Sequence, residues 1–177
     1  MFYEVFGLKD VLSAQTAQQY YEQISNQLKM DALRPRAILD RFDIEFLATT
    51  DGALDSLQFH ENIARAGFGR RVVPTFRPDS VIDPDSPGFF DNVNRLSDIT
   101  GEEATTWNGY LSALKNRREF FKSHGATATD HGHPSAHTSD LSNVECQKLF
   151  AKCLRGDADR QEKECFRGQM LTEMAAM

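Results

Sequence analysis

The sequence contains no long hydrophobic run and no N-terminal targeting pattern. A helix that spans a bilayer needs about 18 to 20 consecutive apolar residues, and no stretch of the 177-residue chain approaches that length. The first residues, MFYEVFGLKD, lack the basic and then apolar order of a secretory signal peptide. These absences argue against a membrane partner and against export, so we expect a cytoplasmic protein.

A basic surface is also missing from the composition. The chain has 20 Lys and Arg against 26 Asp and Glu, with a formal net charge of −6 and a pI near 5.3. Proteins that bind nucleic acids usually carry a basic face for the phosphate backbone. The charge therefore argues against a nucleic-acid partner, and nothing in the sequence fixes an oligomeric state.

Cysteine is scarce and odd in number, with Cys146, Cys153 and Cys165 near the C-terminus. An odd count without an export signal favours free thiols over a disulfide framework. Their spacings of 7 and 12 residues match no common zinc motif, and a fourth ligand would be needed. We expect these three residues to be inert thiols that are buried or half-buried.

What the sequence does contain is the composition of a globular protein, 40% hydrophobic, 26% charged and 10% aromatic. Its length suits a single region with a real core. Residues 1–42 are expected to form leading helices. One is amphipathic, over LSAQTAQQYYEQISNQL, and is opened by the capping box Thr16-x-x-Gln19; a short one starts at Pro35.

Stretches typical of strands and helices alternate over residues 43–137. We predict strands at Ile44 to Ala48, at Val72 to Phe76 and at GATATDH, each bounded by turn residues. The strongest helix covers GEEATTWNGYLSALKNRREFFKSHG, and DPDSPGF is expected to be a loop. Residues 138–177 should form C-terminal helices, the first opened by a capping box at Ser142. Because parallel strands need a helical crossover, the pattern predicts an α/β fold with a parallel sheet.

Ionisable residues stand at the end of every predicted strand. Asp51 follows the first, Arg77 and Asp79 follow the second, and Asp130 and His131 follow the third. In α/β barrels and open α/β sheets, ligands bind at the C-terminal edge of the strands. The pattern therefore predicts that these residues line one rim of an active site.

Several of these residues also have a simpler interpretation. Asp51 and Asp79 each precede a turn or helix, where a carboxylate can cap backbone N–H groups instead of acting as an acid or base. Arg77 suits a binding role, since a guanidinium can hold a carboxylate by two parallel bonds, but a salt bridge to either aspartate is the alternative. His60 and His124 lie on predicted helices and are expected at the surface or its boundary.

The motif His131-Gly132-His133 admits three interpretations. At a strand end, imidazoles at i and i+2 can reach one metal ion. The glycine between them and the proline that follows indicate instead that the strand stops at Asp130, so the second interpretation is hydrogen bonding to a substrate or to the rim. The third is a solvated turn that also includes His137.

Four strings occur in order along the chain: ATTDGALDSLQFHENIA, RVVPTFRPD, FKSHGATATDHGH and FRGQMLTEMAAM. Together they resemble the uronate isomerases, the glucuronate/galacturonate isomerase branch of the amidohydrolase superfamily, over nearly the whole chain. The resemblance implies a partial (β/α)8 TIM-type barrel with about three βα units and additional helices, whereas a closed barrel needs eight. The chain would be an internal fragment of the longer enzyme.

The activity that the resemblance implies is that of an aldose-ketose isomerase, an intramolecular oxidoreductase of glucuronate catabolism. Such an enzyme interconverts D-glucuronate with D-fructuronate and D-galacturonate with D-tagaturonate, by proton transfer between the carbonyl carbon and its neighbour. The family commonly holds one divalent metal, often zinc. Its metal-binding His-x-His lies on the first barrel strand, outside the region matched here, so no metal is expected on this chain.

Our hypothesis divides the rim residues between two roles. Catalysis is assigned to Asp51, Asp130 and His131, and binding of the uronate to Thr50, Arg77 and Asp79. A fragment without the metal ligands of its family is expected to be inactive alone. Two alternatives remain open: a small metal-dependent hydrolase or lyase that uses His131 and His133, and a non-enzymatic helical binding module formed by residues 100–177.

Overall fold

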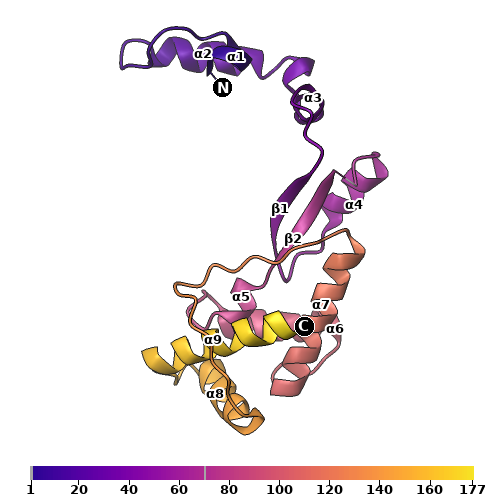
Figure 1. Cartoon of the computed structure of the whole chain (residues 1–177), viewed down its shortest axis with the longest axis vertical. Coiled ribbons are helices and arrows are strands. Elements are labelled where there is room, and N and C mark those ends of the chain that lie inside the picture. Colours follow the sequence, from indigo (N-terminus) through magenta and orange to yellow (C-terminus); the bar gives the residue numbers. More distant parts are fainter. Residues whose placement is uncertain (1, 70) are drawn as a thin grey trace. The chain divides into compact units, whose positions relative to one another are not determined.

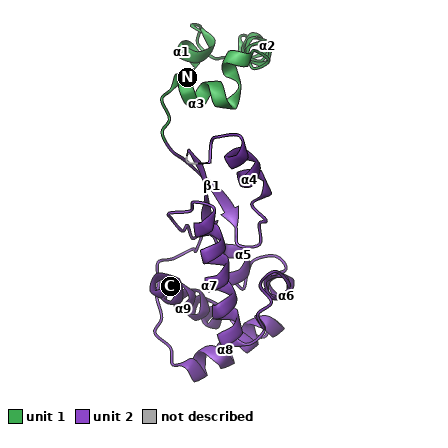
Figure 2. Cartoon of the chain, turned by 90° about the vertical axis from the view of Figure 1, so that its right-hand side faces the viewer, with its two compact units in different colours: residues 1–45 green, residues 46–177 purple. Residues whose placement is uncertain are grey.

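The computed structural model describes residues 2–69 and 71–177. The chain forms two compact units, residues 1–45 and residues 46–177, each with a hydrophobic core of its own (Figure 2). Within the described ranges, no helix is long and apolar enough to cross a membrane. All the predicted rim residues belong to the second unit.

The first unit is helical, as predicted. Its elements are α1 (Phe2–Phe6), α2 (Ala17–Gln27), the short 3-10 helix η1 (Asp31–Leu33) and α3 (Pro35–Arg41). Apolar side chains from these helices and their connections form a small core, which consists of Phe6, Leu8, Tyr20 and Leu33.

Of the two predicted helix starts in this unit, one is confirmed. α3 begins at Pro35, whose ring fixes the φ angle that a first turn needs. The predicted capping box at Thr16 is wrong, because Thr16 has near-helical angles, φ −99° and ψ −10°, and makes no side-chain cap bond. Its Oγ1 donates to the Val11 carbonyl at 2.8 Å. The hydroxyl therefore closes the loop before α2 instead of capping the helix.

The second unit contains the predicted parallel sheet (Figure 1). β1 (Leu47–Gly52) and β2 (Val72–Arg77) pair in parallel, and α4 (Gln58–Arg65) lies on the crossover between them. β2 lies where the sequence predicts it. β1 starts later than predicted, because the Ile44 N–H bonds back to the last turn of α3, where it donates to the Leu39 carbonyl at 2.9 Å.

The third predicted strand forms only a single bridge. Thr129 lies opposite Phe76 in parallel orientation. The Phe76 N–H donates to the Ala128 carbonyl at 3.2 Å, and the Asp130 N–H donates to the Phe76 carbonyl at 3.0 Å. Because neighbouring strands use alternate residues of the strand between them, residues 126–130 lie along the edge of β2 that faces away from β1.

Five helices follow β2. They are α5 (Asp79–Ile82), α6 (Phe89–Thr100), α7 (Trp107–Ser123), α8 (Asn143–Arg155) and α9 (Arg160–Ala176). The DPDSPGF stretch forms a loop up to Gly88, as predicted, but the helix α6 that follows it was not predicted; Gly88, at φ +70°, is its N-cap. α7 starts several residues later than predicted, because Thr106 Oγ1 accepts the Gly109 N–H and caps it. The capping box at Ser142 is confirmed.

An aromatic core joins these helices to the end of β2. Tyr110 of α7 stacks on Phe150 of α8 with ring centroids 4.4 Å apart, and Phe150 stacks on Phe166 of α9 at 5.8 Å. Phe76, near the end of β2, packs edge-on against Phe121 of α7 at 5.0 Å. Burying each such ring contributes about 1.5–3 kcal/mol. The core therefore fixes the strand end where the predicted rim residues lie.

The three cysteines are free, as expected. Cys146 and Cys153 are buried, and Cys165 is half-buried. Burial raises the pKa of the Cys146 thiol to about 11 and that of the Cys153 thiol to about 12. Because the thiolate is the reactive form, these two thiols are inert.

Candidate functional site

Predicted rim residues from two neighbouring strand ends come together in the structure. Arg77 Nε lies 2.9 Å from Asp79 Oδ2 and 3.3 Å from Asp130 Oδ2. The shorter contact is an ion pair without the alignment of a hydrogen bond. The side chains of Arg77 and Asp130 are 43% and 48% exposed, so a ligand can reach them from solvent. We call Arg77, Asp79, Asp130 and His131 the strand-end cluster.

Strand geometry explains why Arg77 and Asp130 meet. Thr129 lies opposite Phe76, so Arg77 and Asp130 are each one residue further along neighbouring parallel strands. Side chains alternate between the two faces along a strand, and residues at equal positions therefore share a face. Asp79 follows two residues later, in the first turn of the short helix α5.

Asp79 joins the two strand ends. Its Oδ1 accepts the Gly132 N–H at 2.5 Å, while its Oδ2 faces Arg77. A Cβ on Gly132 would lie 2.9 Å from Arg77 Nη2 and 3.2 Å from Asp79 Oδ1, so a larger residue at this position would displace the Arg77 guanidinium. Both carboxylate oxygens of Asp79 therefore contact protein groups, one at each strand end.

His131 and His133 lie next to each other in the same loop, with ring centroids 5.7 Å apart. Within the described part of the chain, His131 Nδ1 and both ring nitrogens of His133 are buried without a hydrogen-bond partner. Burial is the main cause that lowers the pKa of His131, and Arg118 adds to it, whereas Asp79 and Asp130 act in the opposite direction. Burial, followed by the neighbouring His131, lowers the pKa of His133. Both imidazoles are therefore neutral near pH 7, with one donor and one acceptor nitrogen each.

The described residues do not assemble a metal site. Across 2–69 and 71–177, no three or more His, Cys, Asp and Glu side chains are placed to hold one ion. His131 and His133 alone would offer two ligands, whereas a catalytic zinc takes three from the protein. What the cluster offers from its own side chains is acid–base and hydrogen-bonding chemistry.

Asp51 lies outside the strand-end cluster. It is in register with Phe76, so its side chain points to the opposite face of the sheet from Arg77. There, Thr49 Oγ1 donates to Asp51 Oδ2 at 2.7 Å and lies 2.8 Å from His60 Nε2. A carboxylate only accepts hydrogen bonds, so Thr49 uses its hydroxyl proton in the bond to Asp51. The Thr49 oxygen is then the acceptor for a proton on His60 Nε2.

The predicted positions of His60, His124 and Thr50 can be compared with the structure. His60 is 8% exposed, so its predicted surface position is wrong: it turns toward β1, where Thr49 binds it. His124 is half-buried and lies 3.5 Å from Glu61, at the predicted boundary. Thr50 is exposed on the face of β1 that Arg77 shares.

Arg117 of α7 holds the loop after β1, although the sequence analysis did not single it out. Its Nε donates to the Ala53 carbonyl and its Nη2 to the Asp55 carbonyl, both at 2.7 Å. The residue is 5% exposed, and its guanidinium lies 4.2 Å from the centre of the Phe120 ring. The signal that could have found it is its spacing, because Arg117 lies three residues after Leu114 on the buried face of the helix.

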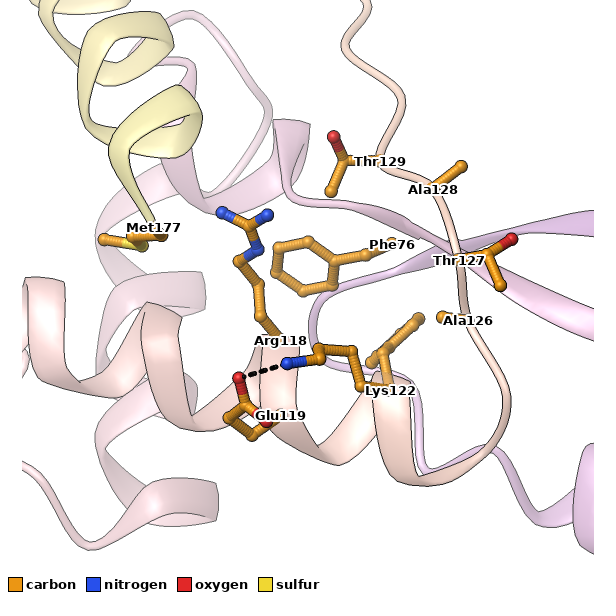
Figure 3. Close-up of a pocket in the computed structure, with 10 residues that line it drawn as sticks. Phe76, Arg118, Glu119, Lys122, Ala126, Thr127, Ala128, Thr129 and Met177 are labelled. Atoms are coloured by element: carbon orange, nitrogen blue, oxygen red, sulfur yellow. Dashed lines mark hydrogen bonds and ion pairs between the residues drawn. The ribbon is translucent and has the colours of Figure 1, made fainter.

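A cavity of about 670 Å³ lies beside residues 126–129 (Figure 3). Phe76 and residues 126–129 line one part of it, and Arg118, Lys122 and Met177 line another. Lys122 pairs with Glu119 at 2.9 Å, and Arg118 Nη1 donates to the Met174 carbonyl at 2.6 Å. The cavity is thus bordered by the outer edge of residues 126–129 and by α7.

Comparisons with known proteins agree on one family. The family model for glucuronate isomerase matches residues 2–177. The uronate isomerase of Mesorhizobium japonicum is 50% identical over 173 residues, which are 98% of this chain and 37% of that protein. The crystal structure of glucuronate isomerase from Caulobacter crescentus matches 99% of this chain and 36% of its own, with a TM-score of 0.91 and 44% identity.

A more distant relative has the same shape. The crystal structure of uronate isomerase from Thermotoga maritima is 26% identical and has a TM-score of 0.87, over 99% of this chain and 39% of its own. The present chain thus spans little more than a third of the length of the relatives it matches. Since the family model covers it almost from end to end, this chain belongs to the glucuronate isomerase family.

Proposed function

We propose that this chain is a segment of a cytoplasmic uronate isomerase of the amidohydrolase type. The complete enzyme would interconvert D-glucuronate with D-fructuronate and D-galacturonate with D-tagaturonate. The match of the family model to residues 2–177 carries the proposal. β1, β2 and residues 126–130 would be neighbouring strands of a (β/α)8 barrel, in which active sites lie at the C-terminal strand ends. The strand-end cluster occupies that position.

Asp130 is the proposed base. An aldose-ketose shift needs a group that takes a proton from the carbon next to the carbonyl and returns one to the carbonyl carbon. Asp130 is half-exposed at its strand end and contacts Arg77 through Oδ2, which leaves Oδ1 for the substrate. His131 is the proposed partner: burial lowers its pKa, so that a neutral imidazole can exchange a proton with a substrate oxygen.

Arg77 is the proposed anchor for the uronate anion. Its ion pairs with Asp79 and Asp130 use Nε, and we assign its Nη groups to the substrate carboxylate, which a guanidinium can hold by two parallel bonds. Thr50 is proposed to contribute a hydroxyl from the same face. We assign Asp79 to positioning Arg77 and Asp51 to supporting the end of β1.

A divalent metal, with zinc as the first candidate, is proposed for the complete enzyme, where it would polarise the substrate carbonyl as a Lewis acid. The described side chains do not fit such an ion, so we assign its ligands to parts of the enzyme outside this segment. No step proposed for the strand-end cluster passes through the metal. The isolated chain is therefore expected to be inactive.

The proposal is tested with a chimera in which this chain replaces its matched segment in the Caulobacter crescentus glucuronate isomerase. The purified chimera should convert D-glucuronate to its ketose. Asp130→Asn should lower kcat at least about hundredfold, the usual contribution of a positioned acid or base. Arg77→Lys should raise KM more than it lowers kcat. Asp98→Asn, an exposed acid on α6, is the matched control and should leave both constants unchanged.

Two outcomes of this experiment would contradict the proposal. The first is a folded chimera that turns over neither D-glucuronate nor D-galacturonate. The second is an Asp130→Asn chimera with the kcat of the unsubstituted chimera. This result would mean that Asp130 is not the base, although the chain would still belong to the family.

A further inference from the structure

Arg167 lies in the middle of α9, and its guanidinium is buried among three carboxylates. The side chain is 9% exposed. Its Nη1 donates to Asp83 Oδ1 at 3.0 Å and to Asp85 Oδ2 at 2.8 Å, and its Nη2 donates to Glu164 Oε2 at 2.9 Å. The residue belongs to the string FRGQMLTEMAAM, and the proposed function gives it no role.

The two aspartates that Arg167 binds lie in the segment that follows β2. Asp83 is the C-cap of α5, and its N–H donates to the Asp79 carbonyl at 2.9 Å. Because α5 is a single turn of four residues, a displacement of Asp83 is passed on to Asp79. The Asp79 carboxylate faces Arg77 through Oδ2 and accepts the Gly132 N–H through Oδ1. By holding Asp83, α9 therefore fixes the carboxylate that joins the two strand ends.

The carboxylate of Glu164 reaches the loop that follows the third predicted strand. Ser135 Oγ donates to Glu164 Oε1, while Oε2 accepts from the guanidinium. One turn further along α9, a Cβ on Gly168 would lie 2.9 Å from Ser139 Oγ and 3.1 Å from the His137 carbonyl oxygen. Glycine in a helix interior costs about 1 kcal/mol relative to alanine, and the close approach of this loop accounts for it. The same helix therefore holds the loops that leave both strand ends.

The ionic network contributes to geometry more than to stability. Taking a guanidinium and carboxylates out of water costs about as much as their attraction returns, so apolar residues of similar volume often stabilise a core equally well. A guanidinium differs from such residues in direction, because its donors lie in one plane and each bond fixes where the acceptor stands. Arg167 is thus suited to fix the relative position of two loops.

We propose that Arg167 and Glu164, which we call the α9 clamp, are positioning residues for the strand-end cluster. The inference rests on the proposed function. Arg167 holds the segment after β2 and so sets the carboxylate that faces the proposed anchor Arg77. Glu164 holds the loop that carries His131, the proposed partner in proton transfer. The first contact bears on binding of the uronate, and the second bears on the chemical step.

The α9 clamp is tested first in the isolated chain, through hydrogen exchange of the Gly132 amide measured by NMR. Arg167→Met keeps much of the length of arginine but has no donor, and Ser135→Ala removes only the contact to Glu164, at an exposed position. In each variant we expect the Gly132 amide to exchange about tenfold faster or more, because its local protection is lost. The matched controls are Arg155→Met, in an exposed ion pair on α8, and Ser112→Ala, exposed on α7. Both should leave the exchange rate unchanged.

The chimera with Caulobacter crescentus glucuronate isomerase tests the effect on the reaction. Arg167 contacts both loops, so Arg167→Met should raise KM for D-glucuronate and lower kcat, each by about tenfold, since small displacements of reacting groups are costly. Ser135→Ala should lower kcat with little change in KM, and Ser135→Thr, which keeps the hydroxyl, should restore it. The rates are corrected for the folded fraction measured by circular dichroism. After this correction, a loss of stability alone would leave both constants unchanged.

The outcomes separate the α9 clamp from the proposed function. A folded chimera without turnover contradicts the proposed function, whereas faster Gly132 exchange in the folded variants would still support the α9 clamp. Unchanged Gly132 exchange in the folded variants overturns it, whatever the chimera does. Unchanged KM and kcat in active Arg167→Met and Ser135→Ala chimeras also overturn it, because the network would then serve only the fold. Ser135→Ala decides the question alone if Arg167→Met does not fold.

Discussion

Replacing Arg117 by methionine tests whether one buried guanidinium holds the loop that follows β1. Methionine preserves much of the length and apolar contact of arginine but has no donor. The substitution removes the hydrogen bonds from Nε to the Ala53 carbonyl and from Nη2 to the Asp55 carbonyl, both 2.7 Å long. It leaves the Ala53 carbonyl buried without this partner.

The expected loss of stability follows from these two bonds. A hydrogen bond from a charged donor contributes about 1.5–3 kcal/mol. Burying the guanidinium carries an opposing desolvation cost, which also lowers the pKa of Arg117, and methionine relieves it. We therefore expect a net decrease of about 2–4 kcal/mol in the free energy of unfolding.

The assay is urea unfolding of the chain, followed by the circular dichroism of its helices. Lys115→Met, on the exposed face of the same helix, is the control and should change stability by less than about 0.5 kcal/mol. Amide hydrogen exchange at residues 53–55 should accelerate in Arg117→Met before the rest of the unit exchanges. Equal stability of Arg117→Met and Lys115→Met would mean that the Arg117 guanidinium does not hold the loop after β1.

Three further predictions concern the strand-end cluster, the two histidines His131 and His133, and the thiols. In the chimera, Gly132→Ala should raise KM for D-glucuronate, because the added Cβ would lie 2.9 Å from Arg77 Nη2; an unchanged KM would contradict the close approach. The folded-state pKa values of His131 and His133 are lowered from 6.5, so below that pH the unfolded chain binds more protons and stability should fall with falling pH. Changing both histidines to glutamine should flatten this decline in urea unfolding, and an equal decline would count against the burial argument. A thiol reagent should modify Cys165 in the folded chain and reach the two buried cysteines of α8 only in denaturant. Equal modification rates for the three thiols would contradict the burial of the α8 cysteines.

Local patterns predicted most elements of the second unit because its helices have an apolar face and β2 is a short apolar run bounded by turn residues. β2 and the capping box at Ser142 fell where apolar periodicity and cap residues placed them. The failures came from contacts that local patterns do not contain. Thr16 matched a capping pattern, but its hydroxyl found the Val11 carbonyl. The helix α6 was missed because its N-cap is Gly88, which has no side chain to mark the start of a helix.

The candidate site was likewise predicted in part. Arg77 and Asp130 lie together because β2 and residues 126–130 run parallel and end at the same edge of the sheet. Asp51 did not join them, because a strand alternates its side chains and the register with Phe76 puts Asp51 on the helix-facing side. His60 and Arg117 were missed because their importance arises only from the carbonyl and hydroxyl groups that the fold brings to them.

The decisive experiment measures the rate at which the chimera with Caulobacter crescentus glucuronate isomerase converts D-glucuronate. Its matched control is the same enzyme with the segment deleted. We predict conversion by the chimera at a rate that Asp130→Asn lowers at least about hundredfold, and none by the enzyme from which the segment is deleted. A correctly folded chimera that binds D-glucuronate but never isomerises it would contradict the claim that this chain carries part of a uronate isomerase active site.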